Sequence, residues 1–456
     1  MFEFSSRTNL FERRAEDYIL KDVKTPELYR ELFSYEQVPK IAFNYRMVPP
    51  NMPDQIWITD TTFRDGQQSI TPYTTEQIVD IFDYLHRLSG PNGIIRQSEF
   101  FIYTKKDQDA VYRCLEKGYK FPEVTSWIRA SKKDFDLVRE IGLEETGILV
   151  SCSDYHIFLK MKMTRREAMD HYLAIVRDCI EHGIRPRCHF EDITRADIYG
   201  FVVPFAMEMM NLMQETGIPI KIRACDTMGY GVTYPGSTLP RCVQGVIYGL
   251  NHFAGVPSSL IEWHGHNDFY KAVSNASYAW LYGASGVNCS LFGIGERTGN
   301  TPLEAMVFEY AQFRGDFDGM DTTVITELAE YYEREIGLEI PPMTPFVGKN
   351  FNVTRAGIHA DGLMKDEEIY NIFDTGTILN RPPRVAVSNT SGTSGIAHWI
   401  NSFYNLKDDE AFDKAHPVVG ILKNWVDEEY DLGRVTVISD EELQEQFERH
   451  MKSRET

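Results

Sequence analysis

The chain of 456 residues lacks the cysteine pattern of a disulfide-rich or zinc-binding protein. Its seven cysteines are scattered, and no two of them form a C-x-x-C pair. An odd count with long spacings favours reduced thiols. The N-terminal stretch MFEFSSRTNLFERRAEDYIL also lacks the apolar core of a signal peptide. Together these absences predict a cytoplasmic protein.

Long apolar runs and an excess of positive charge are missing as well. No uninterrupted apolar stretch is long enough to span a bilayer, so we expect no membrane insertion. Lysine and arginine total 47 against 67 for aspartate and glutamate, which gives a formal net charge of −20. This sign argues against nucleic acid and anionic membranes as partners. A small anionic substrate is still compatible with it, because a local basic pocket can exist in an acidic protein.

What the sequence does contain is a regular alternation of β-rich and amphipathic helical segments. Eight strands with helical segments between them, over about 250 residues, are typical of an α/β protein with a (β/α)8 TIM barrel. A doubly wound open sheet is the alternative. The predicted strands are Ile56–Asp60, Ile94–Ile102, Glu123–Trp127, Gly147–Cys152, Arg185–Phe190, Pro219–Cys225, Leu260–His264 and Val287–Phe292.

The extent of this alternation sets the expected domains. Residues 1–50 are polar and are interpreted as an N-terminal extension. Residues 51–325 form the predicted barrel domain, and residues 326–456, where the alternation stops, form a mainly helical C-terminal appendage. Capping signals support the helices: Thr164 with Glu167 opens one, and Ser439 with Glu442 opens another near the end of the chain.

Polar and titratable residues stand where seven of the eight predicted strands end. Any one of them can simply cap the helix that follows. Barrel enzymes carry their chemistry at the carboxyl ends of the strands, so we expect these side chains to share one mouth. They include Arg64, Asp65, Gln68, Glu99, His156, Glu191, Thr227, His264, His266, Glu296 and Asn300.

The stretch WHGHNDF places two histidines two residues apart at the end of the seventh predicted strand. Residues i and i+2 of a strand face the same side, so His264 and His266 can both point into the mouth. With the Asp65 carboxylate they would form a mixed nitrogen and oxygen ligand set for zinc, manganese or cobalt. Taken alone, the pair is more often two histidines near a strand end than a metal site.

A glycine-rich stretch, GIGERTG, follows the eighth predicted strand. Its spacing is one residue too long for the dinucleotide-binding pattern, and the acidic Glu296 would repel a pyrophosphate. We therefore do not interpret this stretch as a nucleotide site.

Three motifs in order, DTTFRDGQQ, HGHND and GIGERTGNTPLE, give the chain a specific resemblance. It resembles the metal-dependent acyltransferases and lyases that include 2-isopropylmalate synthase, homocitrate synthase, citramalate synthase and HMG-CoA lyase, the DRE-TIM metallolyases. The similarity extends from about Trp57 to at least Tyr370, which is most of the chain.

The resemblance implies a metal site and the chemistry around it. Asp65, His264 and His266 match the metal ligands of these enzymes, with Asn300 as a possible further contact. The family implies a divalent metal, with Mn²⁺ as our first choice and Zn²⁺, Co²⁺ or Mg²⁺ as alternatives.

Four further positions match catalytic or binding groups of the family. Arg64 matches the arginine that polarises the acyl or keto acid carbonyl, and Thr227 matches the threonine that binds the keto acid carboxylate. Glu191 and Glu296 match acidic residues of the synthases. The implied reaction is a Claisen condensation of acetyl-CoA with a 2-oxo acid, followed by thioester hydrolysis.

The segment AGIHADGLMKDEEIY, after the barrel, resembles a part of the synthases that the lyases lack. The resemblance implies that His359 and Tyr370 reach the active site of a neighbouring subunit in a homodimer with exchanged C-terminal segments. His359 is the implied base, assisted by Glu191 or Glu296. The alternative is that His359 is a structural helix histidine.

The side chain of the 2-oxo acid decides which synthase this is. Arg187 and Arg223 share faces with Glu191 and Thr227 on their strands, and such cations suit a second carboxylate. The alternative is that both arginines pair with acids at the barrel floor. We expect contacts to the substrate from Gln68, Glu99, His156, Arg187, Arg223 and Thr227.

Two departures favour one branch of the family. SEFFIYT replaces the E-V-G-F-P stretch that is common in these synthases, and VSNTSG replaces the G-K-H-S-G of isopropylmalate synthases. The pattern is most similar to the Re-citrate synthases, which condense oxaloacetate with acetyl-CoA. Homocitrate synthase is the first alternative, followed by isopropylmalate or citramalate synthase. A carbon–carbon lyase of the HMG-CoA type and a catalytically silent binding module are more distant alternatives.

Overall fold

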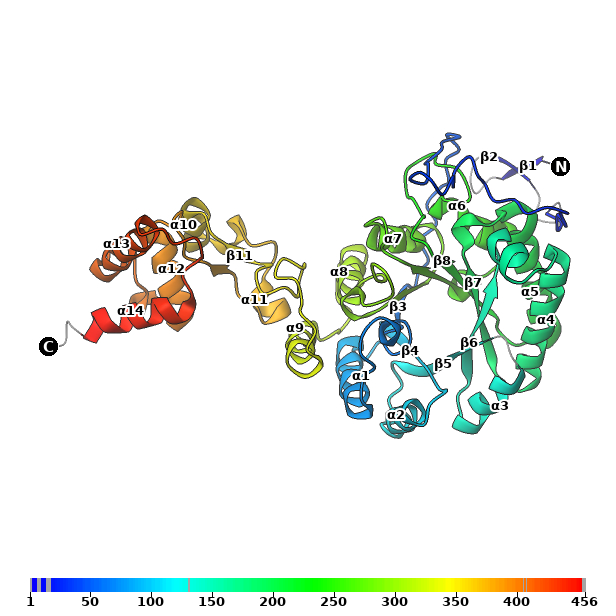
Figure 1. Ribbon diagram of the computed structural model, residues 1–456, viewed down its shortest axis with the longest axis horizontal. Coiled ribbons are helices and arrows are strands. Elements are labelled where there is room, and N and C mark those ends of the chain that lie inside the picture. The colour runs from blue at the N-terminus through cyan, green and yellow to red at the C-terminus, as the bar shows by residue number, and fades with distance from the viewer. Residues whose placement is uncertain are drawn as a thin grey trace. The chain divides into compact units, whose positions relative to one another are not determined.

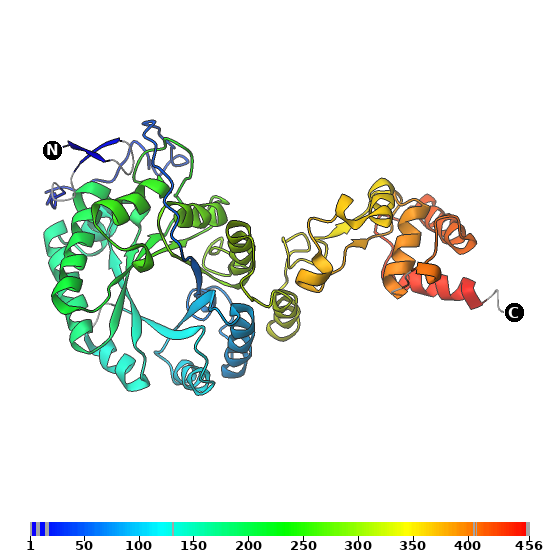
Figure 2. The same ribbon diagram turned by 180° about the vertical axis from the view of Figure 1, so that it is seen from behind.

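The computed structural model describes residues 2–5, 10–13, 18–129, 132–404, 406 and 408–452. The chain divides into two compact units, Met1–Asp321 and Thr322–Thr456. The first contains the barrel and the second contains most of the C-terminal helices (Figures 1 and 2).

Unit one is built around a closed barrel of parallel strands, in the order β10-β3-β4-β5-β6-β7-β8-β9. The predicted (β/α)8 barrel is therefore confirmed, and the open sheet is excluded. Each predicted strand overlaps an observed one. The strands are β3 (Trp57–Asp60), β4 (Ile95–Phe100), β5 (Glu123–Ile128), β6 (Glu145–Ser151), β7 (Arg185–Glu191), β8 (Lys221–Asp226), β9 (Ile261–Gly265) and β10 (Gly286–Cys289).

One α-helix follows each barrel strand and covers its outer face (Figure 1). Local capping explains where some of them begin. Thr164 and Glu167 form the predicted capping box, and Gly183 beyond the end of that helix has a positive φ of 75°. The helices are α1 (Thr75–Ser89), α2 (Lys105–Glu116), α3 (Lys132–Ile141), α4 (Arg165–Glu181), α5 (Val203–Thr216), α6 (Val243–Tyr248), α7 (Ala272–Tyr282) and α8 (Leu303–Arg314).

The N-terminal segment of unit one begins with a hairpin, β1 (Phe2–Ser5) and β2 (Leu10–Arg13). Residues 18–50 then lie against loops that follow β6, β7 and β8. Lys21 donates its backbone N–H to Gly200, and the Arg241 guanidinium donates to the carbonyls of Pro39 and Lys40. These contacts attach the segment to the barrel end that carries the strand carboxyl ends.

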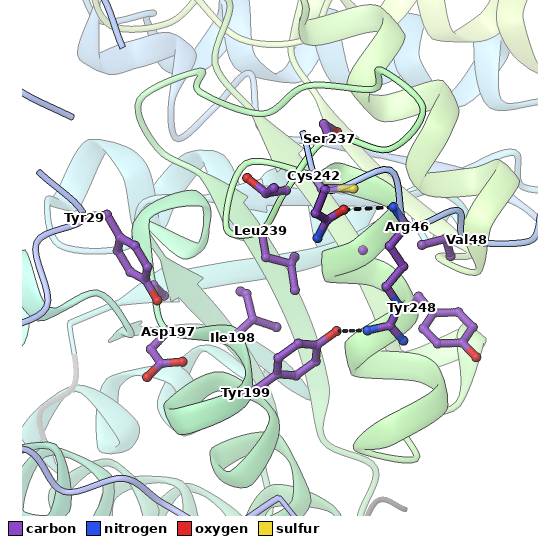
Figure 3. A pocket seen from close by; sticks show the side chains of 14 residues that line it. Tyr29, Arg46, Val48, Asp197, Ile198, Tyr199, Ser237, Leu239, Cys242 and Tyr248 are labelled. Atoms are coloured by element: carbon purple, nitrogen blue, oxygen red, sulfur yellow. Dashed lines mark hydrogen bonds between the residues drawn. The ribbon is translucent and has the colours of Figure 1, made fainter. Parts of the chain in front are cut away.

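The N-terminal segment also closes one side of a cavity of about 190 Å³ (Figure 3). Tyr29 and Arg46 of the segment face Tyr199 and Leu239, and Arg46 donates to the Tyr199 hydroxyl over 3.1 Å. None of the predicted site residues lines this cavity.

Unit two is mainly helical, as expected for the C-terminal appendage. Its buried core includes Trp399, Leu422 and Phe447, from three different helices. Ser439 and Glu442 form the predicted capping interaction, with a Glu442 N–H to Ser439 Oγ distance of 3.2 Å. The elements are α9 (Val324–Tyr331), β11 (Val353–Thr354), α10 (Gly357–Lys365), α11 (Thr375–Leu379), β12 (Arg384–Val385), α12 (Thr393–Tyr404), α13 (Pro417–Asp431) and α14 (Asp440–Lys452).

Two of the absences noted in the sequence can be checked in the structure. Within the described residues, no helix combines the length and apolar character that crossing a membrane requires. The seven cysteines are all buried and none forms a disulfide.

Candidate active site

Four predicted metal-site residues lie together at the carboxyl ends of β3, β9 and β10. Asn300 Nδ2 lies 3.3 Å from Asp65 Oδ2, and His264 Nδ1 lies 3.8 Å from the same oxygen. The rings of His264 and His266 are 5.2 Å apart, centroid to centroid. All four residues are buried. Residues distant in the sequence therefore meet at one place, as the strand-end argument predicted.

The hydrogen bonds of His264 fix which of its ring nitrogens can bind a ligand. Asn288 donates its amide N–H to Thr59 Oγ, over 3.0 Å, so its Oδ1 faces His264 Nδ1 at 2.8 Å. An amide oxygen only accepts, so Nδ1 carries the hydrogen and Nε2 keeps its lone pair. Such a fixed tautomer is what a histidine ligand requires.

Two buried atoms at this place are of the kind that binds a metal cation and lack a hydrogen-bond partner. His266 Nδ1 and Asn300 Oδ1 are buried and have no hydrogen-bond partner. Burial lowers the pKa of His266 to about 3, with a further contribution from His264, so its ring is neutral at pH 7. A carboxylate, two neutral imidazoles and an amide oxygen suit a divalent transition metal. The donor set therefore fits the implied metal chemically.

The carboxylate of this set is engaged by other side chains. Asp65 accepts hydrogen bonds from Arg64, Thr61 and Asn300. Burial raises the pKa of Asp65, but the Arg64 charge and His264 outweigh it, so the net pKa is lowered. Among the described residues, no group of three or more His, Cys, Asp or Glu side chains is arranged to hold a metal ion. A cation bound here would compete with these hydrogen-bond donors for the Asp65 oxygens.

The Arg64 guanidinium lies over the indole of Trp127, a residue that was not among the predicted site residues. Its central carbon lies 4.5 Å from the centroid of Trp127, which is on β5. Stacking holds a guanidinium by its face and leaves the N–H groups in its plane available. The only sequence signal was the place of Trp127 at the end of the third predicted strand.

On the β6 and β7 side, Glu191 forms a second polar cluster. It accepts a hydrogen bond from Ser151 and lies 3.1 Å from His156 Nδ1 and 3.8 Å from Lys160 Nζ. Burial raises the pKa of Glu191, but His156, Ser151 and Lys160 outweigh this and lower it to about 2. Glu191 is therefore a carboxylate at neutral pH. His156 and Glu191 were both predicted, whereas Ser151 was not among the predicted site residues.

Thr227 joins this cluster through the backbone. Its Oγ accepts the N–H of Asp192, the residue after Glu191, over 2.8 Å. A hydroxyl that accepts in this way still has its own hydrogen to donate. Thr227 is thus able to offer a hydrogen bond to an oxygen in the mouth.

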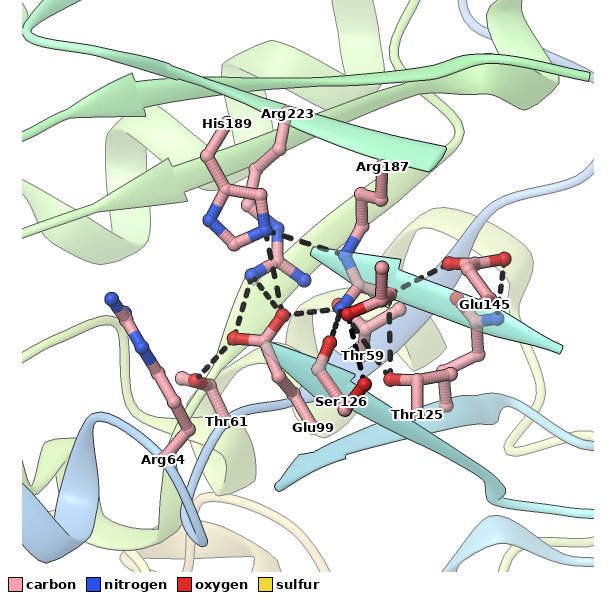
Figure 4. Close-up of polar contacts among 12 residues, drawn as sticks. Thr59, Thr61, Arg64, Glu99, Thr125, Ser126, Glu145, Arg187, His189 and Arg223 are labelled. Atoms are coloured by element: carbon pink, nitrogen blue, oxygen red, sulfur yellow. Dashed lines mark hydrogen bonds and ion pairs between the residues drawn. The ribbon is translucent and has the colours of Figure 1, made fainter. Parts of the chain in front are cut away.

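Arg187, Arg223 and Glu99 form a buried ionic network in the barrel interior (Figure 4). Glu99 lies between the two arginines, with Arg223 Nη1 3.0 Å from Glu99 Oε2, and it is hydrogen-bonded to Arg187. Arg187 also pairs with Glu145 at 2.7 Å, and Arg223 pairs with Glu262 at 2.9 Å. These contacts favour the alternative in which both arginines pair with acids over the prediction that they bind the substrate.

Glu99 nevertheless connects to the metal-site residues. Thr61 Oγ lies 3.3 Å from Glu99 Oε1 and 3.1 Å from Asp65 Oδ2. His189 lies 3.4 Å from Glu99. Burial and the Arg223 charge outweigh the opposing effect of the Glu99 charge and lower the pKa of His189 to about 3, so the ring is neutral at pH 7. The charged network therefore adjoins the polar site, and Thr61 links the two.

The remaining predicted residues lie elsewhere. Gln68 and Glu296 are exposed in the loops that follow β3 and β10. His359 and Tyr370 belong to unit two, where their rings pack with centroids 4.3 Å apart. His359 and Tyr370 are thus direct neighbours within unit two.

A parallel eight-stranded barrel whose strand ends hold a carboxylate, histidines, an arginine and further acids has the architecture of barrel enzymes. The sequence model of the HMGL-like family matches residues 55–331. The chain belongs to this family.

Two curated relatives are similar over nearly the full chain. The chain is 61% identical to the Citrate (Re)-synthase of Clostridium kluyveri, over 94% of each protein. It is 55% identical to the Citrate (Re)-synthase of Syntrophus aciditrophicus, over 95% of this chain and 69% of the relative. The 2-phosphinomethylmalate synthase of Streptomyces hygroscopicus is 35% identical, over 96% of this chain and 99% of the relative.

Among solved structures, the hydroxymethylglutaryl-CoA lyase from Pseudomonas aeruginosa superposes with a TM-score of 0.50. The sequence identity is 15%, and the match covers 63% of this chain and 95% of the lyase chain. At this identity the likeness concerns the barrel fold alone.

The ionic network generates a prediction about pH. Burial raises the pKa of Glu145, but Lys221 and Arg187 outweigh it and lower the pKa to about 2, well below its usual value. The stabilisation is therefore present above about pH 4.5 and is lost as the pH falls towards 2. We expect Glu145→Gln to lower the melting temperature at pH 7 and to flatten its decline between pH 4.5 and 3.

The neighbouring variant Glu144→Gln is the matched control, because Glu144 is exposed and pairs only with Arg185 in the described contacts. Scanning calorimetry at pH 7, 4.5 and 3 compares the three proteins. An unchanged acid slope in Glu145→Gln would contradict the assignment.

Proposed function

We propose that this chain is a Re-type citrate synthase, which condenses acetyl-CoA with oxaloacetate. The observation that carries the proposal is the 61% identity to the Citrate (Re)-synthase of Clostridium kluyveri over 94% of both chains. The lower identity of 30% to 2-isopropylmalate synthase 2 of Caldanaerobacter subterraneus makes a branched 2-oxo acid the weaker candidate.

The overall reaction forms one carbon–carbon bond and breaks one thioester. A base removes a proton from the acetyl methyl group, and the resulting carbanion equivalent attacks the keto carbon of oxaloacetate. The keto oxygen takes up a proton and becomes the hydroxyl group of the citryl thioester. Water then cleaves this thioester to give citrate and CoA.

Asp65, His264, His266 and Asn300 would hold a divalent cation, with Mn²⁺ as our choice. The support is the fixed tautomer of His264 and the unpartnered His266 Nδ1 and Asn300 Oδ1. A bound cation supplies Lewis-acid polarisation of the keto carbonyl.

The chain's own groups orient the keto acid. Arg64, held face-on by Trp127, presents its N–H groups to the oxygen that gains negative charge during attack. Thr227 donates its hydroxyl hydrogen to the carboxylate beside the keto group. Gln68 and His156 are proposed contacts of the second carboxylate, and the layer of Glu99, Arg187 and Arg223 supports the site from below.

Proton transfer at the acetyl methyl group is assigned to His359, with Glu296 or Glu191 as its partner. The low pKa of Glu191 makes it a weak base by itself, and its contact with His156 suits an orienting role. We propose that His359 and Tyr370 act on the barrel of a second subunit in a homodimer. Tyr370 is 41% exposed within its own unit, which leaves it accessible to such a partner. The buried free cysteines suit a reducing cytoplasmic location.

The keto acid decides the identity of the synthase. Thiol release from acetyl-CoA is measured with oxaloacetate, 2-oxoglutarate, pyruvate and 2-oxoisovalerate in the presence of Mn²⁺. We expect kcat/KM to be at least about tenfold higher for oxaloacetate, because an apolar side chain leaves the polar groups of the site unpaired. A preference for 2-oxoisovalerate would sink the proposal, and acyl-CoA cleavage without a keto acid would indicate a lyase.

Metal binding is tested with His266→Ala and Asn288→Ala. The first removes a ligand and should abolish Mn²⁺ binding and activity. The second removes the acceptor that fixes the His264 tautomer and should weaken Mn²⁺ binding about 10- to 100-fold. Isothermal titration calorimetry measures both, with the surface variant His171→Ala as control. Normal Mn²⁺ affinity in His266→Ala would refute the assigned site.

Subunit exchange tests the role of His359. His359→Ala and His266→Ala should each be inactive as homodimers. In each mixed dimer, one of the two barrels keeps its ligands and receives an intact His359. An equimolar mixture, in which about half of the dimers are mixed, should therefore regain about a quarter of wild-type activity. Inactive mixtures whose subunits have demonstrably exchanged would show that His359 does not act across the dimer.

A further inference from the structure

Arg297, in the loop after β10, contacts two neighbouring loops at the barrel mouth. Its Nε and Nη2 bind both carboxylate oxygens of Asp268, at 2.8 and 3.1 Å, in the loop after β9. Its Nη2 also donates to the backbone carbonyl of Thr227, in the loop after β8, over 2.5 Å. One guanidinium thus ties together the loops of three successive strands.

The backbone around Arg297 has a shape that few sequences can adopt. Arg297 itself has a positive φ of 58°, and Gly299 has a φ of 87°. A Cβ on Gly299 would lie 2.0 Å from the Gly293 carbonyl oxygen. Conformations of this kind cost free energy for a residue with a side chain, so surrounding contacts must hold them. For Arg297, the bonds to Asp268 and Thr227 are such contacts.

Two hydrogen bonds hold Thr227, one at its backbone carbonyl and one at its side-chain hydroxyl. Arg297 fixes its carbonyl, and the Asp192 N–H fixes its hydroxyl oxygen at 2.8 Å. The direction of the remaining hydroxyl hydrogen depends on both bonds. The Asp192 contact also extends the connection to the loop after β7, the strand whose last residue is Glu191.

The neighbouring metal-site residues do not depend on Arg297 in the same way. His266 and Asn300 are paired directly as a backbone bridge. The N–H of Asn267 donates to the Gly299 carbonyl over 2.9 Å, and that of Thr301 donates to the Gly265 carbonyl over 3.1 Å. These backbone bonds would remain without the Arg297 side chain.

We propose that Arg297 is a positioning residue for the 2-oxo acid, acting through Thr227 and not through the metal ligands. The inference rests on the proposed function, because it assigns the Thr227 hydroxyl to the carboxylate of the keto acid. Arg297 does this by a planar fork that reaches Asp268 and the Thr227 carbonyl together. Lysine has the charge but not this geometry.

An ordinary exposed ion pair contributes little to stability, and the Arg297 side chain is 38% exposed. Loss of the side chain should therefore leave the fold intact. It removes the one described side-chain contact to the Thr227 carbonyl, so Thr227 can move relative to the cation and Arg64. The expected effect falls on keto acid affinity and not on the melting temperature.

The experiment compares Arg297→Gln, Arg297→Lys and Asp268→Asn with Arg113→Gln. Arg113 is the matched control, since its side chain is 40% exposed and pairs with Glu76 on the outer helices. In both Arg297 variants, KM for oxaloacetate should rise about tenfold, with kcat and KM for acetyl-CoA within about threefold of wild type. Mn²⁺ affinity and melting temperature should match those of Arg113→Gln.

Asp268→Asn should raise the KM for oxaloacetate in the same direction, and the double variant Asp268→Asn/Arg297→Gln should be less than additive. Calorimetric titration of the Mn²⁺-loaded protein with oxaloacetate alone should show the same loss of affinity without turnover.

Three results would overturn the inference. Full recovery in Arg297→Lys would mean that charge alone attracts the anionic substrate. Equal losses in Mn²⁺ affinity, both KM values and melting temperature would mean general loosening of the mouth. An unchanged KM for oxaloacetate in Arg297→Gln would mean that Thr227 needs no such support.

Failure of the proposed function gives a different result. Wild-type protein would then prefer another 2-oxo acid or none. If it prefers another acid, the same variants are compared with that acid. If it condenses none, the calorimetric titrations still decide whether Arg297 affects keto acid binding.

Discussion

The interior of this barrel depends on the neutralisation of Glu99. A carboxylate taken out of water costs several kcal/mol unless opposite charges surround it. Arg187 and Arg223 flank Glu99 on both sides, and their remaining charge is met by Glu145 and Glu262. Because Thr61 bridges Glu99 to Asp65, the lower wall of the site is fixed by electrostatics as much as by apolar packing. The loops above it are held differently, by backbone pairing and by Arg297.

Periodicity predicted the barrel and the strand ends that carry the site, and the motifs shared with the family supplied the roles of the site residues. Eight β-rich segments separated by amphipathic helices have few arrangements other than a parallel barrel, and the strands appear where they were expected. The alternation of side chains along a strand then placed His264 and His266 on one side, and barrel topology brought Asp65 and Asn300 to them. The HMGL-like match and the citrate synthase relatives agree with the motifs that led to the same family.

The sequence could not predict the partners of each charge. Parity placed Arg187 and Arg223 inside the barrel, but the depth of a side chain depends on strand register and tilt, which no motif encodes. The stacking of Arg64 on Trp127 and the orientation of His264 by Asn288 also join strands that are far apart in the sequence. The packing of His359 against Tyr370 within unit two is a further contact that no motif predicted.

The burial of the seven cysteines has a practical consequence for chemical labelling. Burial raises the pKa of Cys114 and Cys188 to about 12, so both remain protonated thiols under ordinary conditions. All seven are shielded from solvent, and a buried, protonated thiol reacts slowly with alkylating reagents. The native cysteines should therefore react only slowly with maleimides. A single engineered cysteine on either unit would accept a fluorophore or spin label selectively, without removal of any native thiol.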